Sequence, residues 1–243
     1  MKKNIRVLYE DNHLLALVKP HGVLSQGDET GDETLLDMGK SYLKFKYEKP
    51  GAVFLGLVHR LDRPTGGVIL FARTAKAASR LSEQFRERRV RKTYLAICER
   101  APHSQSGELH HFLGYDEKRR RSLPSLEPGT GRKSCELRFR VLENSPKTKN
   151  TLLLVHPKTG RKHQIRAQFS ATGNPLLGDR KYGSQTGTSR LVKAIGLWAC
   201  QLEFTHPVKK EMLRIRAFPD SSDPAWWGDF YSTLSSLSGR ESF

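Results

Sequence analysis

Short apolar segments, each about as long as a single β-strand, are the feature of this sequence that most constrains its fold. They are separated by turns rich in Gly, Pro and polar residues. None approaches the ~20 residues that a helix needs to cross a bilayer. Many short strands of this kind indicate a largely antiparallel sheet. The segments are residues 13–18, 53–58, 67–72, 93–98, 135–142, 151–155, 197–204 and 212–218.

Helical periodicity interrupts this pattern in a few places. Apolar residues recur there at intervals of three and four, which is the spacing of one helix face. Thr74 can cap one of these helices, in which Leu81 and Phe85 lie on one apolar face. Ile165 and Phe169 are expected to face inward in another. Strands interspersed with a few helices predict an α+β fold. The helical segments are residues 34–43, 74–85 and 161–172.

At 243 residues, the chain is long enough for a sizeable core. We expect one catalytic domain over residues 1–219 and a C-terminal tail over residues 220–243. The tail is Ser-rich, and its aromatic pairs, Trp226-Trp227 and Phe230-Tyr231, are its means of docking. Residues 101–134 are polar, and we expect them to form a mobile excursion or hairpin outside the core.

The charge balance points to a polyanionic partner. Lys and Arg number 42 against 25 Asp and Glu, which gives a net charge of +17 and a pI near 10.0. Each phosphate that such a surface neutralises releases condensed counterions, so nucleic acid is the favoured partner. A merely soluble basic protein is the alternative that charge alone leaves open.

The cysteines and the N-terminus indicate a reducing compartment. Cys98, Cys135 and Cys200 are far apart, fit no zinc spacing and are odd in number. We expect buried thiols rather than disulfides. The N-terminal residues lack the apolar core of a signal peptide. We therefore expect a cytoplasmic protein that does not bind membranes.

Asp62 lies in a polar run, residues 59–65, between two apolar segments. Arg60 and Arg63 flank it, and nearby positive charge favours the ionised form of a carboxylate. Pro64 and the two glycines that follow fix an unusual backbone and let a ligand approach closely. A surface turn with a salt bridge would show the same local pattern.

A second basic segment, residues 160–166, begins the last of the helical segments. Arg161, Lys162 and a helix N-terminus together would form an anion site. Arg166 lies one turn beyond His163. A capped basic surface helix is the simpler alternative.

Tyr94 follows a basic cluster at the start of a strand-like segment. An aromatic ring beside cations suits base stacking, which is worth roughly 1–3 kcal/mol per base. A tyrosine that is simply part of the core is the more common case.

Several familiar chemistries are excluded. No Gly-x-x-x-x-Gly-Lys-Ser/Thr phosphate loop is present. His59-Arg60-Leu61-Asp62 is similar to the kinase His-Arg-Asp motif, but the other kinase motifs are missing. The histidines have no metal-ligand spacing, and no second acid stands near Asp62 in sequence, as a conventional glycosidase needs. Spacing alone therefore predicts an ionised Asp, basic grooves and an aromatic, but no reaction.

Five blocks of residues occur in a fixed order over roughly residues 8–218. The blocks are Lys19-Pro20-His21-Gly22; His59 to Gly67 with Thr74 to Phe85; Lys92-Thr93-Tyr94-Leu95-Ala96; Gly160-Arg161-Lys162-His163-Gln164-Ile165-Arg166 with Gly178-Asp179-x-x-Tyr182-Gly183; and Leu197-x-Ala199-x-x-Leu202-x-Phe204-x-His206-Pro207. In this order they resemble the RluA family of pseudouridine synthases.

The resemblance implies an isomerase that converts uridine to pseudouridine in rRNA or tRNA without a metal or other cofactor. It implies a mixed, mainly antiparallel sheet with flanking helices and a central active-site cleft. The target uridine is flipped into that cleft. Its uracil is detached from N1, rotated and rejoined through C5. Asp62 acts as a nucleophile or as a base at the sugar, and the sequence leaves both roles open.

The resemblance also assigns roles to single residues. Asp62 is the catalytic carboxylate. Tyr94 stacks on the uracil and helps to remove the C5 proton, and Arg166 pairs with Asp62. Leu197 walls the pocket, and Arg60 fills the gap left by the flipped base. The substrate-binding residues are Arg60, Leu197, Arg161 and His163.

RNA would be gripped by the catalytic domain itself, because the N-terminal S4 domain of many relatives is not expected here. We expect the chain to act as a monomer. The cations expected to form the RNA-binding surface are Arg86, Arg88, Arg89, Arg91, Lys92, Arg119 and Arg120.

Some positions depart from the family pattern. Gly66 replaces a common Ser, Gln168 and Asn174 replace common His residues, and Trp198 replaces His. We expect these changes to affect substrate contacts and loop packing rather than the reaction. A catalytically inactive RNA-binding relative is the alternative, and the retained Asp62 argues against it.

Overall fold

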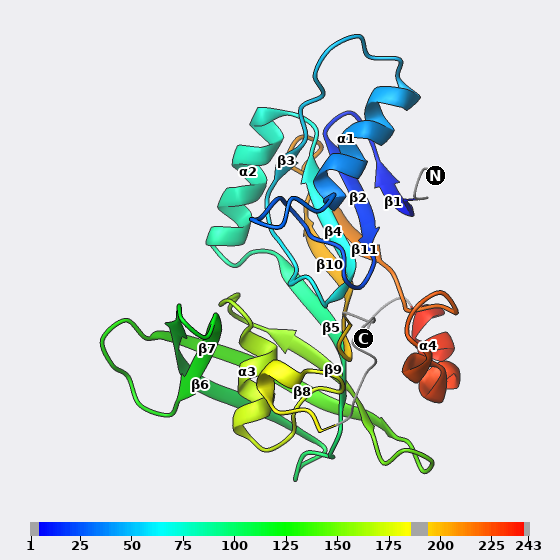
Figure 1. Ribbon diagram of the computed structural model, residues 1–243. Coiled ribbons are helices and arrows are strands. Elements are labelled where there is room, and N and C mark those ends of the chain that lie inside the picture. The colour runs from blue at the N-terminus through cyan, green and yellow to red at the C-terminus, as the bar shows by residue number, and fades with distance from the viewer. Residues whose placement is uncertain (1–4, 186–193, 241–243) are drawn as a thin grey trace. The chain divides into compact units, whose positions relative to one another are not determined.

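The computed structural model describes residues 5–185 and 194–240. The chain divides into two compact units, each with its own hydrophobic core (Figure 1). Unit 1 comprises Met1–Lys92 and Ala199–Ala217, and unit 2 comprises Thr93–Trp198 and Phe218–Phe243.

The centre of unit 1 is a sheet with the strand order β1-β2-β4-β10-β11, and β3 pairs with β4. The pairs β1–β2, β2–β4 and β10–β11 are antiparallel. β2 and β4 are apolar nearly throughout and buried along their whole length, as expected of strands covered on both faces. The strands are β1 (Val7–Glu10), β2 (Leu14–Lys19), β3 (Gly56–Leu57), β4 (Gly66–Ala72), β10 (Leu197–Thr205) and β11 (Met212–Arg216).

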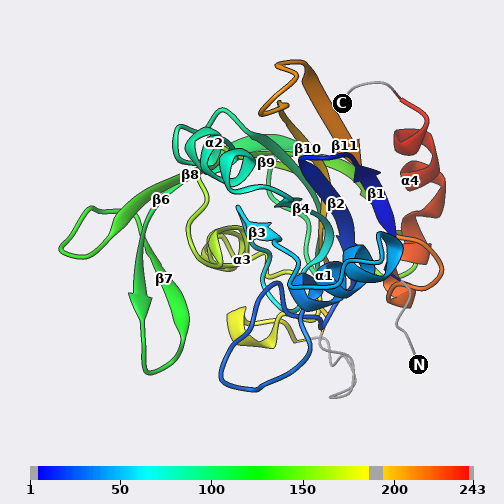
Figure 2. The ribbon, with the colours of Figure 1, turned by 90° about the horizontal axis from the view of Figure 1, so that it is seen from above.

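Two helices, α1 (Leu35–Lys46) and α2 (Ala75–Arg86), pack on this sheet (Figure 2). Both begin after a threonine that caps the first turn. The Thr34 hydroxyl accepts a hydrogen bond from the Asp37 N–H, and the Thr74 hydroxyl accepts one from the third residue along. Such caps satisfy N–H groups that the helix itself leaves unpaired. The expected starts of α1 and α2 are therefore confirmed.

The buried face of α2 is displaced slightly from the expected one. Leu81 is fully buried, but Gln84 is buried where Phe85 was expected. The Gln84 side-chain amide donates to the Thr205 carbonyl at 2.8 Å and accepts from the Thr205 N–H at 3.1 Å. A polar side chain can be buried here because both halves of its amide are satisfied.

Unit 2 contains an antiparallel sheet with the order β5-β9-β8-β6-β7. Helix α3 (Gln164–Ala171) packs on it, with Ile165 and Phe169 buried in the core as expected. The strands are β5 (Arg91–Cys98), β6 (Ser106–Asp116), β7 (Arg121–Ser125), β8 (Lys133–Asn144) and β9 (Thr151–Pro157).

The chain after Pro219 also packs on unit 2. It forms a 3₁₀ turn, η2 (Ala225–Phe230), and helix α4 (Tyr231–Ser238). Trp227 and Phe230 are buried, and the Trp227 ring meets Trp198 edge-on at 6.4 Å between centroids. The boundary of the catalytic domain at residue 219 stays a prediction.

Three expectations about single elements were wrong. Residues 53–58 form only the two-residue strand β3. Residues 101–134 contain the expected hairpin, β6 and β7, but it is not outside the core, because Leu113 joins a buried cluster with Ala167. Helix α3 begins at Gln164 rather than at residue 161, because His163 has a left-handed backbone (φ 52°). The α+β class with a mainly antiparallel sheet is confirmed.

The three cysteines are free and buried, as expected. No helix in the described part of the chain is both long enough and apolar enough to span a membrane.

At Gly67, the backbone of β4 packs very closely against the backbone of β10. Its φ is +115°, and a Cβ at this position would lie 2.3 Å from the carbonyl oxygen of Ala199. We predict that Gly67→Ala lowers the free energy of unfolding by about 2–4 kcal/mol, because backbone strain and a backbone clash add. Urea unfolding measures this effect. The control Gly51→Ala, at a site with no atom within 4 Å, should stay within about 0.5 kcal/mol, and equal stability of the two variants would contradict the prediction.

Candidate active site

Asp62 lies in unit 1, in the loop that leads into β4, and is partly buried. The Thr65 N–H donates to the Asp62 carbonyl oxygen at 2.9 Å, which closes a tight turn around the carboxylate-bearing residue. The loop is short, and it ends in the close packing at Gly67. Its backbone therefore has little freedom on the β4 side.

Residues 21–25, which follow β2, fasten the loop on both sides of Asp62. On the N-terminal side, Ser25 Oγ donates to the Leu61 carbonyl at 2.9 Å. On the C-terminal side, the Gly22 N–H donates to the Arg63 carbonyl at 2.9 Å, and His21 Nδ1 bonds to the carbonyl of the next residue, Pro64, at 2.7 Å. Both chain neighbours of Asp62 are thus tied to a second segment.

Lys19 lies beneath this junction and is completely buried. Its Nζ donates to the carbonyl oxygens of Pro20 at 3.1 Å, Val23 at 2.6 Å and Arg63 at 3.0 Å. Three acceptors require three N–H donors, which only the charged ammonium provides. Burial lowers the pKa of Lys19 to about 7, while the Asp62 carboxylate acts in the opposite direction and favours the charge.

The arginines on either side of Asp62 are less central than the sequence suggested. Arg63 forms an ion pair with Asp32 and donates from Nε to the Gly22 carbonyl at 3.0 Å. Arg60 is exposed to solvent. Lys19 is a buried cation that interacts electrostatically with the Asp62 carboxylate. The Lys-Pro-x-Gly block was the signal that could have identified it.

His59 fixes the start of the same loop. Its Nε2 accepts a hydrogen bond from the Leu70 N–H of β4 at 2.9 Å, so the neutral ring carries its proton on Nδ1. The ring stacks on Phe85 of α2, with centroids 4.8 Å apart. Burial and the positive charge of Lys92 lower the pKa of His59 to about 3. The neutral ring therefore connects the loop to β4 and to α2.

Arg166 lies on α3 in unit 2 and is buried. It forms a two-pronged ion pair with Asp179, with Nε–Oδ2 at 2.7 Å and Nη2–Oδ1 at 2.9 Å. The guanidinium also lies 5.0 Å from the ring centre of Tyr182. Such a pair fixes both the position and the plane of the guanidinium. Asp179 lies in the Gly-Asp-x-x-Tyr-Gly block, but that block alone did not predict this role.

Tyr94 and Leu197 also belong to unit 2. Tyr94 is partly buried on β5, opposite Val155 of β9, and packs against the unit 2 core. Leu197 begins β10 and is buried in the same core. Because Asp62 belongs to the other unit, its expected pairing with Arg166 and its approach to Tyr94 stay predictions.

Arg161 and His163 precede α3 instead of lying in its first turn. Arg161 Nε donates to the Ser134 carbonyl at 3.1 Å. His163 Nδ1 bonds to the Tyr182 hydroxyl at 2.9 Å. Their expected contacts with substrate stay predictions.

Two of the departures from the family pattern have packing roles within unit 2. Gln168 is fully buried, and its amide donates to the Leu109 carbonyl at 2.9 Å. The Asn174 amide donates to the Ala101 carbonyl at 3.0 Å.

The expected RNA-binding cations fall into two groups. In unit 1, Arg86 and Arg88 are exposed at the end of α2, while Arg89 pairs with Glu83 and Glu87. Arg91 and Lys92 lie at the start of β5. Arg91 pairs with Glu203, and burial lowers the pKa of Lys92 to about 8. In unit 2, Arg119 and Arg120 are exposed at the turn between β6 and β7.

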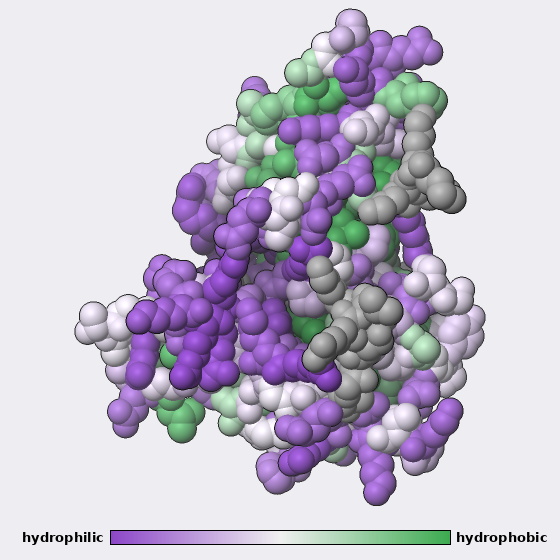
Figure 3. Space-filling model, in the orientation of Figure 1, coloured by the Kyte–Doolittle hydropathy of each residue, from purple (hydrophilic) through white to green (hydrophobic). Residues whose placement is uncertain are grey.

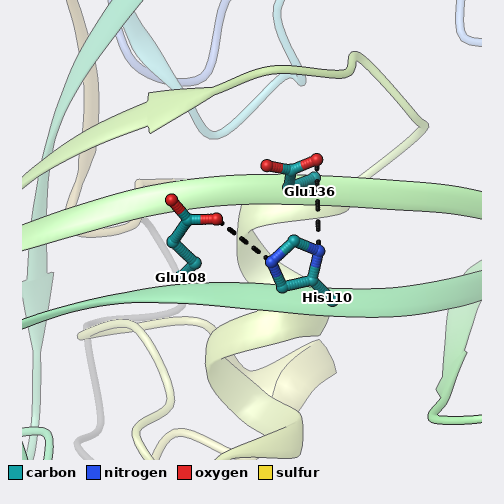
Figure 4. A group of neighbouring side chains, drawn as sticks. All are labelled: Glu108, His110 and Glu136. Carbon is teal, nitrogen blue, oxygen red and sulfur yellow. Dashed lines mark hydrogen bonds and ion pairs between the residues drawn. The ribbon is translucent and has the colours of Figure 1, made fainter.

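One group of potential metal ligands stands out among the described residues: Glu108, His110 and Glu136, on the exposed faces of β6 and β8 (Figure 4). Arg138 binds Glu108 at 2.5 Å, and Lys158 binds both carboxylates. These cations already supply the positive charge that a metal ion would bring. The group is accordingly a surface salt-bridge network.

Comparison with known proteins gives a consistent picture. A family model described as RNA pseudouridylate synthase matches residues 13–171. The uncharacterized RNA pseudouridine synthase YhcT of Bacillus subtilis is 32% identical over 218 residues, covering 88% of this chain and 68% of YhcT. Ribosomal large subunit pseudouridine synthase C of Escherichia coli K12 is 34% identical, covering 87% of this chain and 65% of the relative. The chain thus spans about two thirds of the length of these relatives.

Solved structures show the same fold. Human RNA Pseudouridylate Synthase Domain Containing 4 aligns with a TM-score of 0.73 at 23% identity, over 95% of this chain and 93% of that one. Human RNA Pseudouridylate Synthase Domain Containing 1 aligns with a TM-score of 0.74 at 23% identity, over 100% and 98%.

The neutral state of His59 leads to a prediction about stability and pH. Its pKa of about 3 in the folded chain lies below the ordinary value of 6.5 for histidine. The unfolded chain therefore binds more protons between these values, and stability is lost as pH falls from about 6.5 toward 3, by up to about 1.4 kcal/mol per pH unit. His59→Gln keeps an acceptor but does not titrate, so it should flatten the decline in urea unfolding between pH 6.5 and 4.5. The exposed control His103→Gln should decline like the wild type, and a steep decline in His59→Gln would refute the assignment.

Proposed function

Because the chain belongs to the RNA pseudouridylate synthase family, we propose that it isomerises uridine to pseudouridine in RNA, with Asp62 as the catalytic carboxylate. The observation that carries the proposal is that the Asp62 loop is held in a fixed position. Hydrogen bonds to Leu61, Arg63 and Pro64 fix it, and a buried lysine lies beneath it. Catalytic groups need such fixed positions, because the position of the reacting atoms accounts for much of the rate.

The reaction conserves every atom of the nucleoside. The bond between C1′ and N1 breaks, uracil turns within the site, and a bond forms between C1′ and C5. The proton on C5 leaves, and N1 gains a proton. Asp62 attacks C1′ as a nucleophile or removes a proton from the sugar as a base. Both roles need an ionised carboxylate, and the buried Lys19 interacts electrostatically with Asp62.

The residues of unit 2 complete this proposal. Tyr94 stacks on the uracil and helps to remove the C5 proton, and Leu197 walls the pocket. Arg166 pairs with Asp62. The ion pair with Asp179 supports this last role, because it engages Nε and Nη2 and holds the guanidinium in one plane. A pre-oriented arginine loses little side-chain entropy when it binds a second acceptor.

The proposed substrate is large-subunit ribosomal RNA, as the names of several relatives state for those proteins; tRNA is the other RNA to test. We also propose that the chain works as a monomer in the cytoplasm without a metal or cofactor. The net charge of +17 supports an RNA partner.

Replacing the carboxylate tests the proposal. We predict that Asp62→Asn lowers the release of tritium from RNA labelled at uracil C5 by roughly 10³-fold or more. Asn has the same size and lacks the charge, so RNA affinity in a gel-shift assay should stay within about threefold of wild type. Asp28→Asn, in an exposed turn of the same unit, is the matched control and should keep full activity.

Two outcomes would contradict the proposal. If the wild type releases no tritium from rRNA or tRNA but still binds them, the chain is an inactive RNA-binding relative. If Asp62→Asn loses binding and folding together with activity, Asp62 is a structural residue.

A further inference from the structure

The turn between β6 and β7 and the segment before α3 form one cationic surface on unit 2, which we call the hairpin surface. Hydrophilic side chains cover this part of the molecule in Figure 3. Four consecutive cations, residues 118–121, outnumber the two carboxylates of the same turn, Asp116 and Glu117. The hairpin surface consists of the exposed residues Lys118, Arg119, Arg120, Lys162 and Lys181.

Hydrogen bonds hold the hairpin in a fixed position within unit 2. The Ser122 N–H donates to the Tyr182 hydroxyl at 2.7 Å, and Ser122 Oγ donates to the Lys162 carbonyl at 2.5 Å. Lys181 Nζ donates to the Arg120 carbonyl at 3.1 Å. Three segments that are distant in sequence therefore present their side chains from one rigid base.

A cation covers one face of the aromatic ring at this surface. Lys162 Nζ lies 3.6 Å from the ring centre of Tyr115, a close cation–π contact. A ring covered by an ammonium group suits phosphate binding, where the cation meets the backbone, better than stacking of a base.

Two cations of unit 1 are engaged in ion pairs. Arg89 pairs with Glu83 and Glu87, and Arg91 pairs with Glu203. On the hairpin surface, Arg119 has a weak contact with Asp116, at 3.9 Å, and its side chain is 71% exposed. An anion that binds Arg119 therefore competes with a weaker ion pair than one that binds Arg89 or Arg91.

We propose that the hairpin surface is a sequence-independent grip for the phosphates of RNA. This inference rests on the proposed function. The surface sets the affinity for RNA, and it leaves the choice of uridine and the chemistry to other residues. Its effects should therefore appear in binding and in the salt dependence of binding, because each phosphate contact contributes about 0.7–0.9 to the slope of log K against log salt.

The test is a triple variant, Arg119→Gln/Arg120→Gln/Lys162→Gln, with Lys147→Gln/Lys149→Gln as the control. The control changes exposed cations in the turn between β8 and β9 of the same unit. Dissociation constants for a cellular rRNA fragment and for an unrelated RNA of equal length are measured between 50 and 300 mM KCl. Tritium release is measured at saturating rRNA fragment.

The triple variant should bind both RNAs roughly 10- to 100-fold more weakly, with a salt slope smaller by about 2–3. Turnover at saturating RNA should stay within about twofold of wild type. The control should match the wild type in every measurement.

An unchanged salt slope in an active triple variant would overturn the inference, as would weaker binding of the rRNA fragment alone. A slowed turnover at saturation would also overturn it, because the surface would then take part in the chemistry. If the wild type itself releases no tritium, the proposed function fails, and the binding measurements still decide whether the surface grips RNA.

Discussion

The Asp62 loop depends on the hydrogen bonds that the buried ammonium group of Lys19 donates. A buried charge costs several kcal/mol unless it is paired and hydrogen-bonded. Here three carbonyl oxygens and the nearby carboxylate offset that cost. Because one acceptor is the carbonyl of Arg63, the residue after Asp62, the loop cannot move away without leaving a buried charge under-bonded.

The strands carry this constraint into the sheet. Lys19 ends β2 and lies opposite Gly67 in the register of β2 and β4. Gly67 in turn lets the backbone of β4 approach that of Ala199 on β10. The Asp62 loop is thus held at the end of the two most buried strands of unit 1, where the sheet itself is rigid.

Arg166 shows the same principle in unit 2. A buried carboxylate, Asp179, orients its guanidinium. Tyr182 lies beside this guanidinium, and its hydroxyl bonds to His163. Buried polar contacts therefore hold the Asp62 loop in unit 1 and the Arg166 side chain in unit 2. Fully satisfied contacts of this kind favour one arrangement over others.

The sequence predicted the parts of this structure that depend on local patterns. The apolar runs of β2 and β4, the cap Thr74, and the place of Asp62 between apolar segments all follow from residue order. Ordered motifs then identified the family. The strands of residues 101–134 were harder to predict, because the alternation in β6 and β7 is weak and both strands are largely polar.

Other features depend on contacts between distant residues, which periodicity does not encode. The pairs Lys19–Arg63 and Arg166–Asp179 bring together residues 44 and 13 positions apart. The late start of α3 depends on the left-handed backbone at His163, a conformation that histidine adopts only occasionally. Gln84 is buried because of its partner Thr205, 121 residues away.

Amide hydrogen exchange in Lys19→Met tests the central claim most directly. Met is apolar and of similar length, so it removes the donors with little change in volume. The account predicts that exchange at the amides of Gly22, Leu61 and Thr65 becomes roughly 10²-fold faster, while the amides of α2 keep their wild-type protection. Unchanged protection at these three amides would show that the Asp62 loop does not depend on Lys19.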